Sequence, residues 1–191
     1  MKQSEGEKQR TRQIGEYLVA IKLMEHGWYA TTFTGNMPLF DIIATNDESE
    51  TVIVQVKAKR RGDWQLDMKK FVEIKFDVNG VQAIGELIRL PSNLYYVLVK
   101  LDSDIMRSTF YVVPSQHFQS YLVKRYQKWL EEISGRRTDN PKSTHSALGE
   151  WEVDKYLKDY ENNWSIIHET ALHDRYQNPE VINGEKPNAK P

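Results

Sequence analysis

Apolar residues recur with helical spacing over residues 11–25 and form two stripes on the predicted helix. The stripes consist of Ile14, Leu18 and Ile21, and of Val19, Ala20 and Leu23. Two apolar stripes predict a helix that packs on more than one side. Thr11 or Ser4 can cap its beginning, and Gly27 can end it. Glu16 lies in register with the second stripe, so its side chain is expected at the edge of a buried face.

Three apolar runs after this helix predict successive strands over residues 28–34, 40–45 and 51–59. Turn residues 35–38 and polar residues 46–50 separate them. In the third run alternate side chains point to opposite faces of the strand. Gln55 and Lys57 are two residues apart, so they point the same way, away from Val54 and Val56.

Later segments predict a helix over 81–88, strands over 94–101 and 109–113, a helix over 115–133 and a short helix near 150–160. A strand or loop is expected at 64–66. This order predicts an α/β fold, with a mixed sheet of about five strands flanked by helices. The expected organisation is a disordered segment 1–10, one domain over 11–135, an extension with a short helix over 136–175 and a disordered tail 176–191.

Composition supports a folded chain of 191 residues, since 39% are hydrophobic and five Trp and ten Tyr are present. The net charge of −1 argues against a wholly basic nucleic-acid binder, although residues 138–191 carry a net charge of −4 and the front a net charge of +3. Cysteine is absent, which excludes disulfides and thiolate metal sites. No apolar stretch is long enough to span a membrane, and the first residues are not a secretory signal, so a cytoplasmic protein is expected.

Four polar residues stand in an order that suggests phosphodiester chemistry. Glu16 lies in the first helix, Asp41 opens the second strand after Pro38-Leu39-Phe40, and Gln55 and Lys57 lie near the end of the third strand. Hydrolysis of a phosphodiester needs a nucleophilic water and a place for negative charge to accumulate. A hard cation such as Mg²⁺ provides both, and it prefers oxygen ligands.

On these residues, the segment 12–61 resembles nucleases of the PD-(D/E)xK superfamily, and especially the archaeal Holliday-junction resolvase and RecB-like branch. That branch has a Glu in the first helix, an Asp at the second strand and Glu-x-Lys or Gln-x-Lys at the third. Glu16, Asp41, Gln55 and Lys57 match these positions. The resemblance implies a restriction-endonuclease-like fold.

The resemblance also implies roles, a cofactor and partners. Asp41 would be the central ligand of Mg²⁺ or Mn²⁺, and Glu16, the Gln55 amide oxygen and the Val56 carbonyl would be further ligands. Lys57 would orient the attacking water or stabilise the developing negative charge. The implied function is a metal-dependent hydrolase of nucleic-acid phosphodiester bonds. DNA is the expected partner, and a homodimer is the implied assembly.

Each residue also has an ordinary structural interpretation. Glu16 can be a solvated helix residue, Asp41 a cap, and Gln55 and Lys57 exposed polar residues of a strand. The basic run at Lys59, Arg60 and Arg61 can bind phosphates or be a solvated loop. Because Gln55 brings no charge to a metal site, the alternative function is a catalytically weak or inactive module that binds nucleic acid or a protein partner. Residues 124–129 form a second cluster of basic and aromatic residues, whose aromatic members, Tyr126 and Trp129, are expected mostly to pack in the core.

Overall fold

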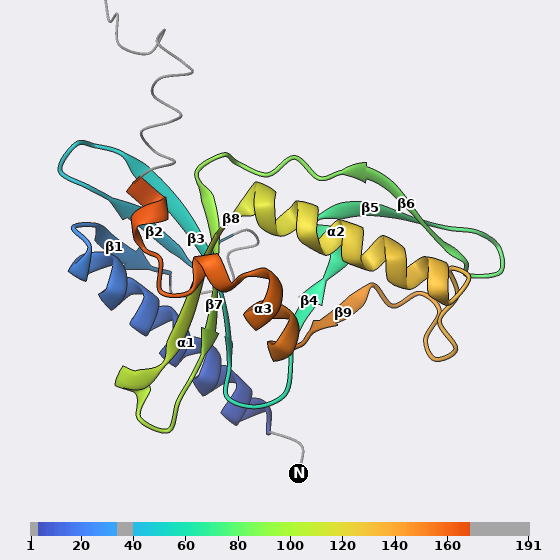
Figure 1. Cartoon of the computed structure of the whole chain (residues 1–191), viewed down its shortest axis with the longest axis horizontal. Helices are drawn as coiled ribbons and strands as arrows, with labels where there is room; N and C mark the ends of the chain where they lie inside the picture. Colours follow the sequence, from blue (N-terminus) through green and yellow to red (C-terminus); the bar gives the residue numbers. More distant parts are fainter. Residues whose placement is uncertain (1–3, 34–39, 169–191) are drawn as a thin grey trace, which may run out of the picture.

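The computed structural model describes residues 4–33 and 40–168. Its central sheet has five strands, in the spatial order β1 (Tyr29–Thr32), β2 (Ile42–Thr45), β3 (Thr51–Lys59), β7 (Leu94–Lys100) and β8 (Thr109–Pro114) (Figure 1). Neighbouring strands are antiparallel except β3 and β7, which are parallel. The predicted α/β class, with a five-stranded mixed sheet flanked by helices, is confirmed.

The sheet is buried on both faces, and alternate residues of its strands enter two different cores. Helix α1 (Glu5–Glu25) covers one face, where Leu18, Val19 and Leu23 pack with Val54 and Val97. Helix α2 (Ser115–Glu132) covers the other face. There its apolar side chains pack with alternate residues of β7 and β8, in a cluster that includes Phe118, Leu122, Tyr126, Tyr96, Leu98 and Val113.

Two small antiparallel sheets extend the second face. One pairs β4 (Trp64–Asp67) with β9 (His145–Leu148), and the other pairs β5 (Val72–Phe76) with β6 (Gln82–Leu87). The helix predicted over 81–88 is therefore wrong. The turn before β6 explains the strand, because Asp77 Oδ1 accepts hydrogen bonds from the backbone N–H groups of Asn79 and Val81, and Gly80 has φ 78°. The described chain also has three short 3₁₀ helices, η1 (Met68–Lys70), η2 (Ile105–Arg107) and η3 (Lys158–Tyr160).

The C-terminal part of the described chain belongs to the same cores, so no structural boundary lies near residue 135. Strand β9 supplies the pairing partner of β4. Helix α3 (Glu150–Tyr156) follows β9, and Val153 and Leu157 are buried in the α2 cluster. Trp164 and Ile167 are buried with α1 on the opposite face. The expected tail at 176–191 lies outside the described residues, as does the turn at 35–38.

Helix α1 begins six residues earlier than predicted, so residues 5–10 are helical and the expectation of disorder there is wrong. The side chain of Ser4 caps the helix by accepting a hydrogen bond from the Glu7 N–H at 3.2 Å. The sequence pattern missed this segment because it has no apolar stripe. Gly27 follows the helix with φ 84°, as expected of a residue that ends it. None of the described helices is long and apolar enough to cross a membrane.

Gly15 sets the distance between α1 and β3. A Cβ atom added to Gly15 would lie 2.4 Å from Ala58 Cβ. We therefore expect Gly15→Ala to lower the free energy of unfolding by about 1–3 kcal/mol through overpacking, although alanine is favoured over glycine in helices by about 1 kcal/mol. Chemical denaturation monitored by circular dichroism measures the change.

Gly6→Ala is the matched control, because Gly6 lies in the same helix and its added Cβ meets only Arg10 Nη1, at 3.6 Å. It should be neutral or stabilising. The double variant Gly15→Ala with Ala58→Gly removes the clash and should recover most of the loss. A Gly15→Ala protein as stable as the wild type would contradict this account of the close packing.

Candidate functional site

A cleft of about 600 Å³ lies beside the end of β3, and it contains three of the four residues selected from the sequence. Asp41, Gln55 and Lys57 line it, together with Val56. Glu16 does not line the cleft itself. Including Lys57, six basic residues line it: Lys8, Arg12, Lys57, Lys59, Arg61 and Lys70. The only acidic residues of its described lining are Asp41 and Asp63. The cleft therefore has the charge expected of a site for a polyanion.

Asp41 is held by the neighbouring strand. Its Oδ2 atom accepts a hydrogen bond from the Val56 backbone N–H at 2.8 Å and another from the Gln55 side-chain amide. Its own N–H donates to the Val54 carbonyl at 2.8 Å. Asp41 and Gln55 are only 6% and 5% exposed. The antiparallel pairing of β2 and β3 therefore fixes the acid and the amide against one another.

Glu16 joins this group through Arg12, one turn earlier on the same helix. The Arg12 guanidinium lies between two carboxylates, with Nε 2.8 Å from Glu16 Oε1 and Nη2 3.4 Å from Asp41 Oδ1. Sequence analysis did not select Arg12. Its spacing of four residues from Glu16 is the signal that could have found it, because residues i and i+4 are neighbours on a helix.

Burial disfavours the charged form of two groups of the site, Glu16 and Lys57. Burial raises the pKa of Glu16 above its ordinary value, although the hydrogen bond from Arg12 acts in the opposite direction. Burial also lowers the pKa of Lys57, and the positive charge of Lys70 adds to this effect. Within the part of the chain that the structure describes, the Lys57 ammonium has no hydrogen-bond or ion-pair partner. Such shifts in a cleft are typical of functional groups.

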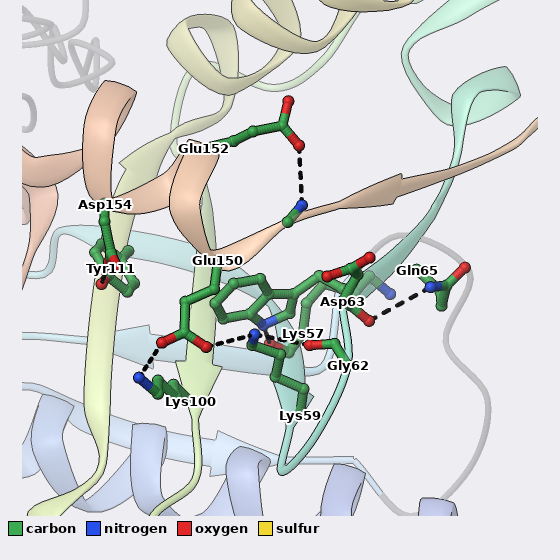
Figure 2. A network of polar contacts seen from close by, with 12 residues as sticks. Lys57, Lys59, Gly62, Asp63, Gln65, Lys100, Tyr111, Glu150, Glu152 and Asp154 are labelled. Carbon is green, nitrogen blue, oxygen red and sulfur yellow. Dashed lines mark hydrogen bonds and ion pairs between the residues drawn. The ribbon is translucent and has the colours of Figure 1, made fainter. Parts of the chain in front are cut away.

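The basic run at the end of β3 divides into three different environments. Lys59 is 6% exposed, and its Nζ lies 2.8 Å from the Gly62 carbonyl, 3.0 Å from Glu150 Oε2 and 4.0 Å from the centre of the Trp64 ring. Figure 2 shows Glu150 between Lys59 and Lys100. These two ion pairs join the start of α3 to the ends of β3 and β7. Lys59 is thus engaged in the fold, which does not fit the predicted role in binding phosphate.

Arg60 and Arg61 differ in their surroundings, because only Arg61 lines the cleft. Arg60 donates to the Asp102 carbonyl at 3.0 Å and does not line the cleft, whereas Arg61 is exposed and lines it. The other exposed cations of the lining are Arg12 and Lys8 of α1, which pair with carboxylates of the same helix, and Lys70 of η1. Sequence analysis missed both lysines, because each comes from a segment whose structure it did not predict.

The oxygen atoms of the site suit a hard divalent cation, although the total negative charge of these groups is small. Two carboxylates, an amide and the β3 backbone provide oxygen atoms, which are the ligands that Mg²⁺ and Mn²⁺ accept. Asp41 and Glu16 already share one cation, the guanidinium of Arg12. However, no group of three His, Cys, Asp or Glu residues that could hold a metal occurs within residues 4–33 and 40–168. The residues therefore fit a metal site only if Arg12 leaves the two carboxylates.

Comparison with known proteins gives a likeness of fold. The chain is similar to the solved structure of a bacterial homing endonuclease, I-Ssp6803I, with a TM-score of 0.46 and 17% sequence identity, over 87% of this chain and 97% of that chain. No protein-family profile and no curated protein matches the sequence. A likeness at this level concerns the arrangement of elements and assigns no role to a residue.

Proposed function

We propose that this protein is a metal-dependent nuclease of the PD-(D/E)xK type, which hydrolyses phosphodiester bonds of DNA in the cleft beside β3. The observation that carries the proposal is the placement of Asp41, Gln55 and Lys57 in one cleft whose other ionisable side chains are mostly basic. Exposed Lys8, Arg61 and Lys70 would contact the phosphates on either side of the bond that is cut.

Asp41, Glu16, the Gln55 amide oxygen and the Val56 carbonyl would hold a Mg²⁺ or Mn²⁺ ion. The ion, when bound, supplies a more acidic water and neutralises charge on the phosphate. Lys57 would donate a hydrogen bond to a non-bridging phosphate oxygen as negative charge develops there. Its ammonium is free to do so, because it has no partner among the described residues. Gln55 would keep Asp41 oriented through their hydrogen bond.

A second candidate function is a module that binds nucleic acid without cutting it. The observation that favours it is the position of Arg12, which pairs with both carboxylates and so fills the place of a metal ion. The neutral amide of Gln55 also leaves the site with less charge to attract a divalent cation. In this alternative, Arg12 and Lys57 would bind phosphate directly, and Asp41 would only hold the start of β2 against β3.

Plasmid nicking and DNA binding, measured on the same protein, distinguish the two functions. Supercoiled plasmid is incubated with the protein in Mg²⁺, in Mn²⁺ and in EDTA, and binding of a labelled duplex is followed by anisotropy in EDTA. The nuclease proposal expects nicking in at least one metal and none in EDTA. Tight duplex binding with no nicking in either metal would contradict it and support the binding module.

Replacing Gln55 by Glu tests the metal site independently of cleavage. In the metal-free protein the new carboxylate, when ionised, could not donate a hydrogen bond to Asp41, and two buried carboxylates would repel one another. We therefore expect Gln55→Glu to have a lower Tm than the wild type in EDTA. A bound cation would relieve the repulsion, so addition of Mn²⁺ should raise the Tm of Gln55→Glu more than that of the wild type.

The matched control is Gln127→Glu, which adds the same charge at an exposed position of α2. Its response to Mn²⁺ should equal that of the wild type. Calorimetric titration with Mn²⁺ gives the affinities directly, and Gln55→Glu should bind at least about tenfold more tightly, as a gain of about 1.4 kcal/mol from the added charged ligand implies. Equal affinities for Gln55→Glu and the wild type would show that residue 55 is not a ligand.

A further inference from the structure

A second groove, of about 470 Å³, lies between α2 and α3 and is separate from the cleft in its lining residues. The two helices lie beside one another in Figure 1. Four aromatic side chains line the groove: Tyr121 and Trp129 of α2, and Trp151 and Tyr156 of α3. The prediction that the aromatic residues of 124–129 pack in the core holds for Tyr126, which is buried there, while Trp129 is partly buried against the same core and also lines this groove.

The aromatic side chains of α3 are unusually exposed. Trp151 is 66% exposed and Tyr156 is 52% exposed, whereas Trp28, Trp64 and Trp164 are buried. The rings of Tyr121 and Tyr156 lie 5.6 Å apart between centroids, with an angle of 37° between their planes. A group of exposed aromatic rings around a concavity is typical of an interaction site, because covering the apolar ring faces removes them from water and is favourable.

The charged side chains that line the groove include one ion pair and two lysines outside it. Arg125 is bound to Glu152, and it also donates to Ser146 Oγ at 2.8 Å. Lys124 and Lys128 are exposed on the same side of α2, four residues apart. Neither ammonium has a hydrogen-bond or ion-pair partner within residues 4–33 and 40–168. Glu132 is the one remaining carboxylate of the described lining, so the unpaired charge of the groove is positive.

We propose that this groove binds single-stranded nucleic acid. The aromatic rings would stack with unpaired bases, and Lys124 and Lys128 would contact the phosphates that follow them. An uncharged sugar or a proline-rich peptide would use the rings but leave both ammonium groups without a partner. Duplex DNA hides the faces of its bases, so it cannot stack on Trp151 and Tyr156. This binding needs no metal ion and no cleavage, and it therefore stands apart from the chemistry of the cleft.

The groove and the cleft are joined by the first residues of α3. Glu150 pairs with Lys59, which lines the cleft, while Trp151 and Glu152 line the groove. A single strand of nucleic acid bound in the groove would thus contact α3, the helix that Glu150 joins to Lys59 of the cleft (Figure 2). If the protein is a nuclease, the groove would favour substrates that contain an unpaired segment.

Oligothymidylate titration in EDTA tests the groove with the full-length protein. Stacking on Trp151 should quench tryptophan fluorescence, and the anisotropy of a labelled oligothymidylate gives the affinity. Trp151→Ala and Tyr156→Ala should each weaken binding by roughly 5- to 150-fold. Trp151→Phe keeps a stacking face and should bind close to wild type. Tyr29→Ala is the matched control, because Tyr29 is 66% exposed on β1 and does not line the groove.

Three results would overturn the proposal. The first is unchanged affinity in Trp151→Ala and Tyr156→Ala proteins that keep the wild-type Tm. The second is loss of oligothymidylate binding in Lys57→Met but not in Trp151→Ala, which would assign the binding to the cleft. The third is a change of oligomeric state in Trp151→Ala, measured by analytical ultracentrifugation, without a change in affinity, which would make the groove an interface between two copies of the chain. Failure of plasmid nicking would leave this test unaffected.

Discussion

Lys57→Met is expected to reduce plasmid nicking by about 10²- to 10³-fold, the usual cost of removing one group that stabilises negative charge in a transition state. Lys57 lines the cleft with Asp41 and has a free ammonium among the described residues. Metal affinity should stay near the wild-type value, because the lysine is not a ligand. The measurement is a time course of nicking at saturating Mn²⁺ together with calorimetric titration of the ion. Lys75→Met, at an exposed position of β5, is the matched control and should nick like the wild type.

The same variant should be more stable than the wild type at neutral pH, by about 1 kcal/mol. Burial lowers the pKa of Lys57 below its ordinary value of 10.5, so the folded protein holds the charged lysine at a cost. At pH values between the pKa of Lys57 in the folded protein and its pKa in the unfolded chain, the unfolded chain binds more protons than the folded protein. The free energy of unfolding of the wild type therefore rises with pH in this range. The advantage of Lys57→Met should be greatest at pH 7 and shrink toward pH 10.5. A lower stability of Lys57→Met at neutral pH would show that the lysine is structural.

Asp41→Asn is expected to lower nicking by more than about 100-fold and to weaken Mn²⁺ binding. With its amide oxygen in the place of Asp41 Oδ2, asparagine can still accept the hydrogen bonds that the Val56 N–H and the Gln55 amide donate there. The fold should therefore be kept, which circular dichroism and Tm measurements check. The lost charge would leave Glu16 as the remaining anion beside Arg12.

Asp139→Asn removes the same charge at an exposed position outside the cleft, and it should match the wild type in both assays. The contrast between the two variants separates a ligand effect from a change in net charge. Wild-type nicking by Asp41→Asn would exclude Asp41 from the reaction.

The parts of the site that the sequence predicted are those fixed by strand periodicity. Strand β3 was predicted with its observed limits, Thr51–Lys59, and its alternation placed Gln55 and Lys57 on the face opposite Val54 and Val56. The same apolar pattern placed Asp41 at the beginning of the second strand, and the structure places it directly before β2. Strands β7 and β8 and helix α2 were also predicted closely, because each is a long apolar or amphipathic segment between clear turn signals.

The remaining parts depend on contacts between distant segments. Arg12 reaches Asp41 only because Gly15 lets α1 approach Ala58 of β3. Lys70 belongs to η1, which directly follows β4, a strand whose pairing partner lies far along the chain. Strand β9 finds its partner β4 across about half of the described chain. The burial of Lys59 depends on contacts with α3 and β4, so a local basic run could not distinguish it from Arg61.

The most direct test of the central claim is the crystal structure of the protein soaked in Mn²⁺, with anomalous diffraction recorded at the manganese edge. The account predicts an anomalous peak bounded by the side chains of Asp41, Glu16 and Gln55, with the Arg12 guanidinium moved away from the two carboxylates. A structure at saturating Mn²⁺ with no peak in the cleft, and with Arg12 still between Glu16 and Asp41, would contradict a metal-dependent nuclease.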